Sequence, residues 1–463
     1  MSMDWMLLAI LGYILAQLGI GAFISSRIKT EDDYLVAGRS LGYGLTTFTL
    51  FATWFGAETC IGAAGAIYTD GLAGGSADPF GYGLCILFMG IVFAIPIWKR
   101  KLTTLADLYR ERYSTLVERT AIALMIPGSM FWAAAQIRAF GQVLSASSGW
   151  DVTMSISIAA GIVVIYTMFG GLLADAWTDL LQGIVLIAGL VTLFVLLMQD
   201  QSAGLGELIQ PEQLALFGGP DVGWMDLIET WAIPIVGSVT AAELLTRAIA
   251  AKSPQVAKRS AFMASGLYLA IGMIPAVIGL MGATLMPGLE HPEQLLPRMA
   301  QEHLPTVLYA LFNGALVSAI LSTVDSVLLV AASMLSHNII VPLRPEYTER
   351  QKVRVARLSV AGCGLLAYIM ALNAEGVHDL VEEASAFGSA GLFVVIVCSL
   401  FVPWGGPVSA MSALIAGIVS WVLGAYVWDL PHPYLLSLAA SGTGYAVAML
   451  VETRLAAARR STA

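Results

Sequence analysis

Four small or hydroxyl-bearing residues recur at helical spacing within the apolar segment 304–336. Ala319, Ser322, Thr323 and Ser326 occupy positions i, i+3, i+4 and i+7, so they share one face of a helix. Neutral hydroxyl and carbonyl oxygens suit a small, hard, monovalent cation such as sodium. The alternative is that these hydroxyls pack helices together or bond back to their own backbone.

Two acids stand in or beside apolar segments, where a charge is costly unless it has a function. Asp325 shares an overlapping helical stripe with Ser318 and Ser322, and Asp179 lies in the apolar segment 176–199. These positions suggest a second cation site or a proton-titrating site. The alternative for Asp179 is a solvated position near the cytoplasmic end of its helix.

Two apolar segments contain helix breakers together with an acid. Segment 42–68 carries Gly56 followed by Glu58, and segment 227–248 carries Pro234 and Gly237 followed by Glu243. Paired broken helices at corresponding positions are typical of inverted-repeat transporters, whose site lies between the broken ends. Gly and Pro are also commoner in membrane helices than in soluble ones, which is the simpler interpretation.

The composition defines what kind of protein must position these residues. Apolar residues make up 58% of the 463 residues, charged residues only 12%, and the formal net charge is -9. This balance excludes a soluble globular protein and a disordered chain, and the acidic charge argues against a nucleic-acid partner. The cysteines and histidines lack metal-site spacing, so no cofactor is expected. The chain is predicted to be an all-α integral membrane protein.

Thirteen segments are long and apolar enough to cross a bilayer, which needs roughly 20 residues per helix. All 23 Lys and Arg residues except Arg138 and Arg298 fall in alternate connections or in the C-terminal tail, and Arg247 is counted in one such connection. The positive-inside rule then predicts an N-terminus outside and a C-terminus in the cytoplasm. The expected segments are 4–24, 42–68, 79–98, 119–147, 152–170, 176–199, 227–248, 258–286, 304–336, 354–373, 377–402, 406–428 and 432–452.

Five segments resemble those of the sodium/solute symporter family. The strongest reads YTMFGGLLADAWTDLLQ from Tyr166 to Gln182, which is similar to the family's YTxxGGLxAVxWTDxxQ apart from Asp175, where Val is usual. The others are DYLVAGR at 33–39, GAETCIG at 56–62, KLTTLADLY at 101–109 and STVDS at 322–326. Three further segments resemble the branch that contains choline transporters, namely ATW at 52–54, PFGY at 79–82 and MFWAAA at 130–135.

The resemblance implies a LeuT-type fold in one transmembrane domain, residues 1–463. Two inverted repeats of five helices, at about 41–200 and 226–402, would follow one extra helix and precede two more. The resemblance also implies a sodium site formed by the carbonyls of Ala52, Phe55 and Ala319 with the hydroxyls of Ser322 and Thr323. In some members a second sodium site includes the Asp179 position and serines. Because Asp325 replaces one of these serines, a second cation or a proton at Asp179, Asp325 and Ser326 is left open.

The solute site is expected around the aromatic positions of the choline-transporter branch, Trp54, Tyr82 and Trp132, which can surround a quaternary ammonium by cation–π attraction. Ala241 and Ala242 replace further aromatic-cage residues of that branch. The remaining candidate solute residues are Glu58, Gln136 and Arg138.

Arg138 decides the preferred solute class. A guanidinium near mid-membrane needs an anion, so a carboxylate-bearing solute is preferred over a choline-like cation. The rival is a structural ion pair of Arg138 with Glu58 or with another buried acid. A rotation of 100° per residue also puts Arg138 about 120° around the helix from Trp132, so both side chains cannot point at the centre of one pocket.

These residues predict a sodium-coupled symporter of the plasma or inner membrane, which imports a small organic solute by alternating access. Its expected partners are sodium, the solute and the lipid bilayer, with no obligatory protein partner. A signalling module is disfavoured because the chain ends at Ala463, soon after the last expected helix. An enzyme is not expected because no nucleophile–base pair is evident, and a channel is disfavoured because broken helices that bind both ion and solute indicate a carrier.

Overall fold

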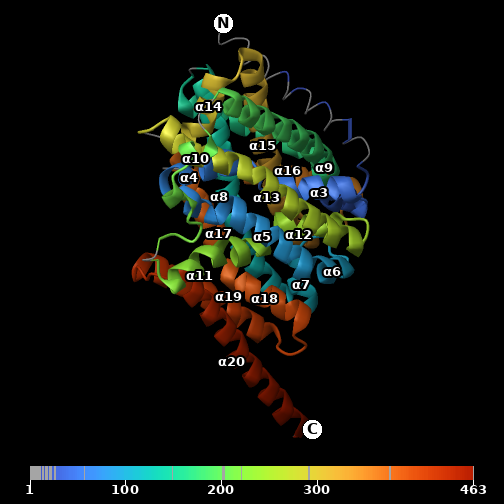
Figure 1. The fold of residues 1–463 in the computed structure, drawn as a ribbon. Helices are drawn as coiled ribbons and strands as arrows, with labels where there is room; N and C mark the ends of the chain where they lie inside the picture. The colour runs from blue at the N-terminus through green and yellow to red at the C-terminus, as the bar shows by residue number, and fades with distance from the viewer. Residues whose placement is uncertain are drawn as a thin grey trace.

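The computed structural model describes residues 28–56, 58–148, 150–200, 204–219, 222–289, 292–374 and 377–461, with isolated positions 12, 15, 19, 23 and 24. Apart from a β-bridge between Leu41 and Ala251, the regular structure of these residues is helical, as Figure 1 shows. The all-α prediction is therefore confirmed for the described part of the chain. The expected first span, 4–24, lies almost entirely outside the described residues.

Long helices form the body of the molecule, and shorter pieces connect or interrupt them. The long helices are α8 (Thr115–Ser148), α9 (Val152–Asp200), α13 (Pro254–Leu285), α15 (Thr306–Ser333), α16 (Glu349–Asn373), α19 (Pro407–Val422) and α20 (Pro433–Ser461). The shorter α-helices are α2 (Glu31–Val36), α3 (Tyr43–Ala52), α4 (Ala64–Asp70), α5 (Tyr82–Phe88), α6 (Ala94–Lys99), α7 (Ala106–Arg112), α10 (Leu205–Leu208), α11 (Trp224–Ala232), α12 (Ala242–Ala250), α14 (Leu295–His303), α17 (Val377–Ala386) and α18 (Ser389–Phe401).

Short 3₁₀ and π turns complete the chain between these helices. The turns that matter below are η2 (Glu58–Ala63), η4 (Ser76–Gly81), η7 (Ile233–Gly237), η8 (Ser238–Thr240) and η10 (Met334–Ile340). The others are η1 (Ala37–Arg39), η3 (Gly71–Gly75), η5 (Met89–Phe93), η6 (Pro211–Leu214), η9 (Pro292–Gln294), η11 (Val341–Leu343) and η12 (Leu423–Val427).

Nine helical segments in the described part of the chain are long and apolar enough to span a membrane. A tenth is the bent pair Trp224–Thr240 and Ala242–Ala250, and Val152–Met168 is a shorter apolar helix. The count of thirteen spans and the orientation of the chain stay predictions. The nine are Glu58–Lys99, Thr115–Ser145, Gly171–Gln199, Pro254–Leu285, Thr306–Leu343, Glu349–Asn373, Ala384–Phe401, Pro407–Val427 and Pro433–Leu455.

Helix α15 forms the interior of the bundle. Every residue from Phe312 to Ser333 is buried, and the helix packs against both α8 and α9. A helix that is enclosed on all sides has no face toward lipid or water, so its polar side chains must find partners within the protein. The hydroxyl stripe at 319–326 therefore faces other helices.

Helix α9 bends at Gly171, in the middle of the Tyr166–Gln182 motif. Gly171 has φ 63° and ψ 172°, and a Cβ atom there would lie 2.8 Å from the ring of Tyr34. Only glycine tolerates that backbone conformation and that approach. The Tyr166 hydroxyl donates to Thr178 Oγ1 across the bend at 2.7 Å. The motif thus fixes the angle at which α9 presents the residues that follow Gly171.

A polar cluster joins α7 to the end of α15. Asp107, in the 101–109 motif, accepts hydrogen bonds from the Thr104 N–H and from Asn338 Nδ2, each at 2.9 Å. Burial favours the neutral form of Asp107, but the hydrogen bond and charge of His337, together with the Thr104 N–H, outweigh it and lower the pKa below its usual value. A charged Asp107 therefore holds α7 against η10.

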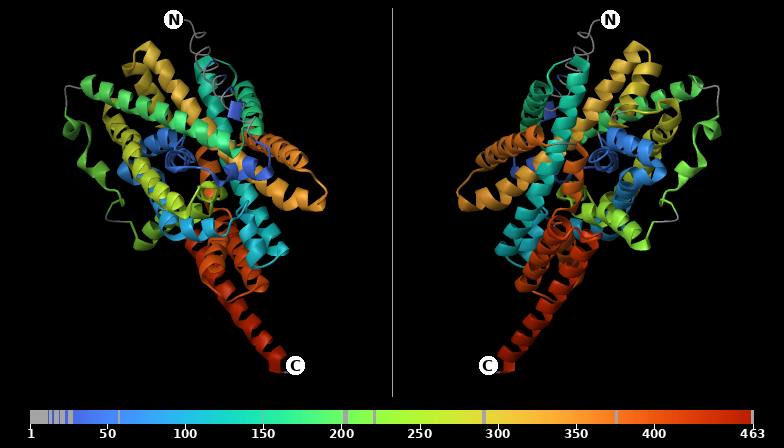
Figure 2. Two further views of the ribbon diagram at one scale, coloured as in Figure 1. Left: turned by 90° about the vertical axis from the view of Figure 1, so that its right-hand side faces the viewer. Right: turned by 90° about the vertical axis from the view of Figure 1, so that its left-hand side faces the viewer.

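The C-terminal helices form a group of their own. Helix α19 packs along α20, and both contact α18, while α20 extends beyond the rest of the molecule in Figures 1 and 2. Glu452 of α20 accepts hydrogen bonds from the N–H groups of Gly406 at 2.7 Å and Val408 at 3.1 Å. A carboxylate at these free N–H groups satisfies the start of α19 and fixes it to its neighbour.

Candidate functional site

The first broken helix interrupts the apolar segment between α3 and η2. Helix α3 ends at Ala52 and a turn covers Thr53–Gly56. A Cβ atom on Gly56 would lie 2.8 Å from Thr323 Oγ1 and 3.1 Å from the Ala319 carbonyl oxygen. Glycine at this position therefore lets the backbone of the turn lie directly against α15.

The oxygens expected to bind sodium gather where this turn meets α15. Ser322 Oγ and Thr323 Oγ1 each lie 3.4 Å from the Ala52 carbonyl oxygen, and Thr323 Oγ1 lies 3.2 Å from the carbonyl of Ala319. Phe55 is buried in the same turn. The set consists of neutral, buried oxygens that converge from two elements, which fits the chemistry of a monovalent hard cation.

Asp179 lies directly beside these oxygens. It accepts hydrogen bonds from the hydroxyls of Thr49 on α3 and Ser322 on α15, and its side chain is fully buried. The alternative that placed Asp179 in solvent at a helix end is therefore wrong. Its contact with Ser322 puts a carboxylate next to a proposed sodium ligand.

Asp325 and Ser326, the other two residues of the expected second cation or proton site, contact Asp175. Ser326 donates to Asp175 at 3.2 Å, and Asp325 lies close enough to Asp175 for the two carboxyl groups to share a hydrogen bond. Asp325 Oδ1 is buried and has no hydrogen-bond partner among the described residues. Asp179 thus contacts α15 at Ser322, one helical turn before Ser326, whereas Asp175 contacts both Ser326 and Asp325.

Arg247 is a site residue that the sequence analysis assigned to the wrong place. It was counted in a cytoplasmic connection, but it lies in α12 with no exposed surface and forms an ion pair with Asp175, donating also to Ser326. A guanidinium in the core must have a carboxylate partner. Asp175, which departs from the family motif, was the signal in the sequence for a buried cation.

The second broken helix runs through α11, η7, η8 and α12. It bends by 49° at Ala241, whose extended backbone has φ -60° and ψ 124°. This break borders a cavity with an empty volume of about 510 Å³. The lining residues are Trp54, Leu124, Met125, Gly128, Ser129, Trp132, Gly237, Ser238, Thr240, Ala241, Ala242, Glu243, Ala384, Ser385, Phe387, Ser389 and Leu392.

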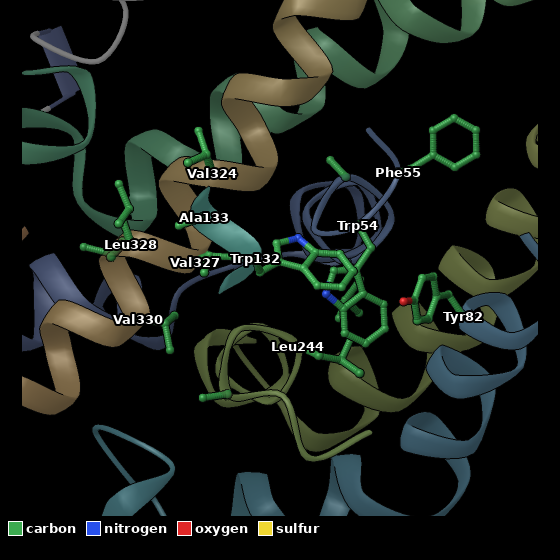
Figure 3. Close-up of a cluster of buried hydrophobic side chains, with 14 of the residues drawn as sticks. Trp54, Phe55, Tyr82, Trp132, Ala133, Leu244, Val324, Val327, Leu328 and Val330 are labelled. Atoms are coloured by element: carbon green, nitrogen blue, oxygen red, sulfur yellow. The ribbon is translucent and has the colours of Figure 1, made fainter. Parts of the chain in front are cut away.

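The three aromatic residues expected at the solute site contact one another, and two of them, Trp54 and Trp132, line this cavity. The ring centroid of Trp54 lies 5.2 Å from that of Tyr82 and 6.3 Å from that of Trp132, and the Tyr82 and Trp132 centroids are 6.0 Å apart. Figure 3 shows the two indoles side by side, with Phe55 turned away from them. The Tyr82 hydroxyl lies 3.2 Å from Ser385 Oγ, which lines the cavity.

Glu243 adds a carboxylate that the sequence analysis noted without giving it a role. It lines the cavity, is buried, and accepts a hydrogen bond from the Trp54 indole N–H at 3.4 Å. Its position just after a helix break was the available signal. Glu58 lies near the aromatic group, where it accepts from the Tyr82 hydroxyl at 3.4 Å.

The remaining candidate solute residues, Gln136 and Arg138, do not line the cavity. Gln136 is buried in α8, and Arg138 Nη1 donates to the carbonyl of Ala371 on α16 at 3.0 Å. The geometry agrees with the 120° separation from Trp132 around the helix. Arg138 therefore contacts α16, and its role in solute binding stays a prediction.

Comparison with known proteins decides the family. The model of the sodium:solute symporter family matches residues 34–417. The chain belongs to the sodium:solute symporter family. It is therefore an integral membrane transporter that uses sodium to drive the movement of a small solute, and it is not an enzyme.

Curated relatives within the family transport different solutes. The chain is 28% identical to the human high affinity choline transporter 1, over 93% of this chain and 77% of that protein. It is 24% identical to the high-affinity proline transporter PutP of Bacillus subtilis, over 88% and 89% of the two chains. It is also 25% identical to the sodium/pantothenate symporter of Haemophilus influenzae, over 87% of each chain.

Solved structures establish the fold. A substrate-bound, outward-open Na⁺-coupled sialic acid symporter matches with a TM-score of 0.85 and 20% identity, over 97% of this chain and 98% of that one. A nucleobase-cation-symport-1 family transporter in a closed conformation matches with a TM-score of 0.63 and 16% identity, over 91% and 95%. The expected LeuT-type fold is confirmed.

Proposed function

We propose that the solute of this sodium-coupled symporter carries a positively charged nitrogen, which binds between Trp54, Trp132 and Glu243. The observation that carries the proposal is the Glu243 carboxylate in the cavity wall beside the two indoles. Aromatic faces attract a cation through their quadrupole, and a carboxylate in a site of low polarity strengthens that attraction.

The same wall disfavours a solute that is only an anion. The lining residues include no Lys, Arg or His, so nothing among them balances a carboxylate, while Glu243 repels it. The names of the relatives are consistent with this: choline and proline, which two of them are named for, both contain a positively charged nitrogen, whereas pantothenate does not. A carboxylate-bearing solute fits this cavity as a zwitterion.

Sodium is proposed to bind at Ala52, Phe55, Ala319, Ser322 and Thr323, because their neutral oxygens converge at the first break. Each sodium charge that moves down 100 mV supplies about 2.3 kcal/mol, enough for roughly fifty-fold accumulation. A second cation or a proton at Asp179, Asp325 and Ser326 belongs to the same proposal, as the buried charges there need compensation.

The proposed setting is the plasma or inner membrane, with the N-terminus outside and no obligatory protein partner. The inverted repeats at about 41–200 and 226–402 would rock against each other around the two breaks. This arrangement exposes the cavity to one side of the membrane at a time, which is alternating access.

Uptake into proteoliposomes tests the solute class. Labelled choline, proline and pantothenate are offered with an inward sodium gradient, with a potassium gradient, and with no gradient. The proposal expects sodium-dependent uptake of a compound with a cationic nitrogen, and competition by other such compounds. Sodium-dependent uptake of pantothenate that cationic and zwitterionic compounds do not inhibit would refute it.

A further inference from the structure

Two further acids lie beside the aromatic group and have no role in the proposed function. Glu58 begins η2, just after the first break, and Asp78 lies in η4 with 2% of its surface exposed. One carboxylate oxygen of each is held by hydroxyl groups. Asp78 Oδ2 accepts from Thr59 at 2.6 Å and from Tyr268 at 3.2 Å, and Glu58 Oε1 accepts from Tyr82 at 3.4 Å.

The second oxygen of each acid is buried and has no hydrogen-bond partner in the part of the chain that the structure describes. Glu58 Oε2 and Asp78 Oδ1 form no hydrogen bond, and none of the ion pairs among the described residues includes either acid. The two carboxyl groups are also near enough to repel each other. Buried carboxylate oxygens are costly when they lack a donor or a cation, so this pair is arranged for a positively charged ligand.

We propose that Glu58 and Asp78 form an additional sodium-binding site, with Glu58 Oε2 and Asp78 Oδ1 as its charged ligands. The hydroxyls of Thr59, Tyr82 and Tyr268 surround the two carboxylates and supply neutral oxygens. A hard cation prefers such an all-oxygen set. Sodium is the ion assigned to this pair because the family couples transport to sodium.

This site is separate from the oxygens at the first break. Those oxygens belong to the turn at Ala52 and to α15, whereas the acid pair belongs to η2 and η4 and contacts Tyr268 of α13. Helix α13 and turns η2 and η4 pack together. The proposed sodium site at the first break therefore lies against α15, whereas the acid pair lies against α13.

The additional site also adjoins the solute cavity. The Tyr82 hydroxyl contacts both Glu58 and Ser385, and the Tyr82 ring packs against Trp54. A cation that attracts Glu58 changes the hydrogen bonding of Tyr82, which in turn contacts Ser385 and Trp54 of the cavity wall. Sodium at the acid pair is therefore expected to alter solute affinity, and by reciprocity the solute alters sodium affinity there.

Equilibrium binding of radioactive sodium to the purified full-length protein tests the site. Asp78→Asn and Glu58→Gln keep the side-chain shapes and remove one charge each, so each is expected to bind one sodium ion fewer per chain than wild type. Asp70→Asn is the matched control, because Asp70 is exposed at the end of α4. Ser322→Ala reports on the break site separately, so the two proposals fail independently.

A second measurement uses the wild-type chain. A hydrophobic carbodiimide modifies buried carboxyl groups, and mass spectrometry of the peptides reports labelling at Glu58 and Asp78. Saturating sodium, but not potassium, is expected to reduce that labelling at least tenfold. Full sodium stoichiometry in Asp78→Asn, or labelling that sodium leaves unchanged, would show that the two acids share a proton and bind no ion. Protection by calcium at lower concentration than sodium would overturn the assignment to a monovalent ion.

Discussion

The two broken helices are fastened to the same pair of helices by different chemistry. Before the first break, the Thr49 hydroxyl donates to Asp179 on α9, and Asp179 also accepts from Ser322 on α15. After the second break, Arg247 pairs with Asp175 on α9 and donates to Ser326 on α15. The two anchors therefore lie one helical turn apart along both α9 and α15.

This difference in partners distinguishes the proposed ion site at the first break from a structural ion pair after the second break. Hydroxyl donors leave the negative charge of Asp179 uncompensated, so a cation bound nearby is stabilised by it. The guanidinium of Arg247 already balances Asp175 and holds α12 in place. The first break therefore carries the proposed sodium site. The second break is held in place by Arg247, and Ser238 and Glu243 beside it line the cavity proposed to bind the solute.

The largest expected effect follows from removing the ion pair between Arg247 and Asp175, after the second break. Arg247→Gln leaves Asp175 buried without its charge partner, which is expected to cost about 3–5 kcal/mol of stability. Chemical unfolding of the detergent-solubilised protein measures this loss. Arg298→Gln is the control, since Arg298 is an exposed arginine of α14 that donates to Gln294 at the end of η9.

The double variant Asp175→Asn with Arg247→Gln sharpens the same test. Removing both charges restores neutrality, so part of the lost stability should return. A double variant that is as unstable as the sum of the single variants would mean that the two residues do not act as a pair.

The next largest effect concerns the solute side of the second break. Glu243→Gln removes the charge that faces a cationic nitrogen, and a hydrogen bond or contact to a charged group is worth about 1.5–3 kcal/mol. Solute affinity is therefore expected to fall by roughly 10- to 100-fold. Competition binding at saturating sodium measures it, with exposed Glu346→Gln as the control. Unchanged affinity would place the cationic group elsewhere in the cavity.

A substitution at the first break should instead weaken sodium binding more than solute binding. In Gly56→Ala the new methyl group meets Thr323 Oγ1 and the Ala319 carbonyl, so the sodium ligands must separate. The sodium concentration for half-maximal uptake is expected to rise about tenfold, a loss of about 1.4 kcal/mol. Solute affinity at saturating sodium should change much less. Gly44→Ala in α3 is the control, because a Cβ there meets nothing within 4 Å.

What the sequence could predict at these breaks depended on local spacing. The stripe Ala319, Ser322 and Thr323 and the two interrupted segments follow from helical periodicity and from Gly and Pro, and the structure brings them together. The rotation of α8 and the path of α12 depend on packing between distant segments. For that reason the sequence places Arg247 wrongly in a connection and gives no role to Glu243.

The same dependence on packing explains why the acid pair Glu58 and Asp78 could not be found from the sequence. Asp78 sits in an irregular turn, η4, with no periodic pattern to indicate which way its side chain points. Only the fold shows that η2 and η4 share α13 as a neighbour. Sequence motifs indicated the family and the ion site, but the pairing of distant turns required the structure.

The smallest expected effect belongs to Arg138, which lies outside both breaks. Arg138→Gln loses at least the hydrogen bond to the Ala371 carbonyl on α16, at a half-buried position, and one such bond contributes about 1 kcal/mol of stability. Solute affinity should stay within about twofold of wild type, and Arg138→Lys, which keeps the charge, should behave in the same way. Competition binding with zwitterionic and purely anionic compounds measures both variants. If Arg138→Gln instead abolished affinity for a carboxylate solute while Arg138→Lys retained part of it, the solute would be held from α8. The assignment of solute recognition to the second break would then be wrong.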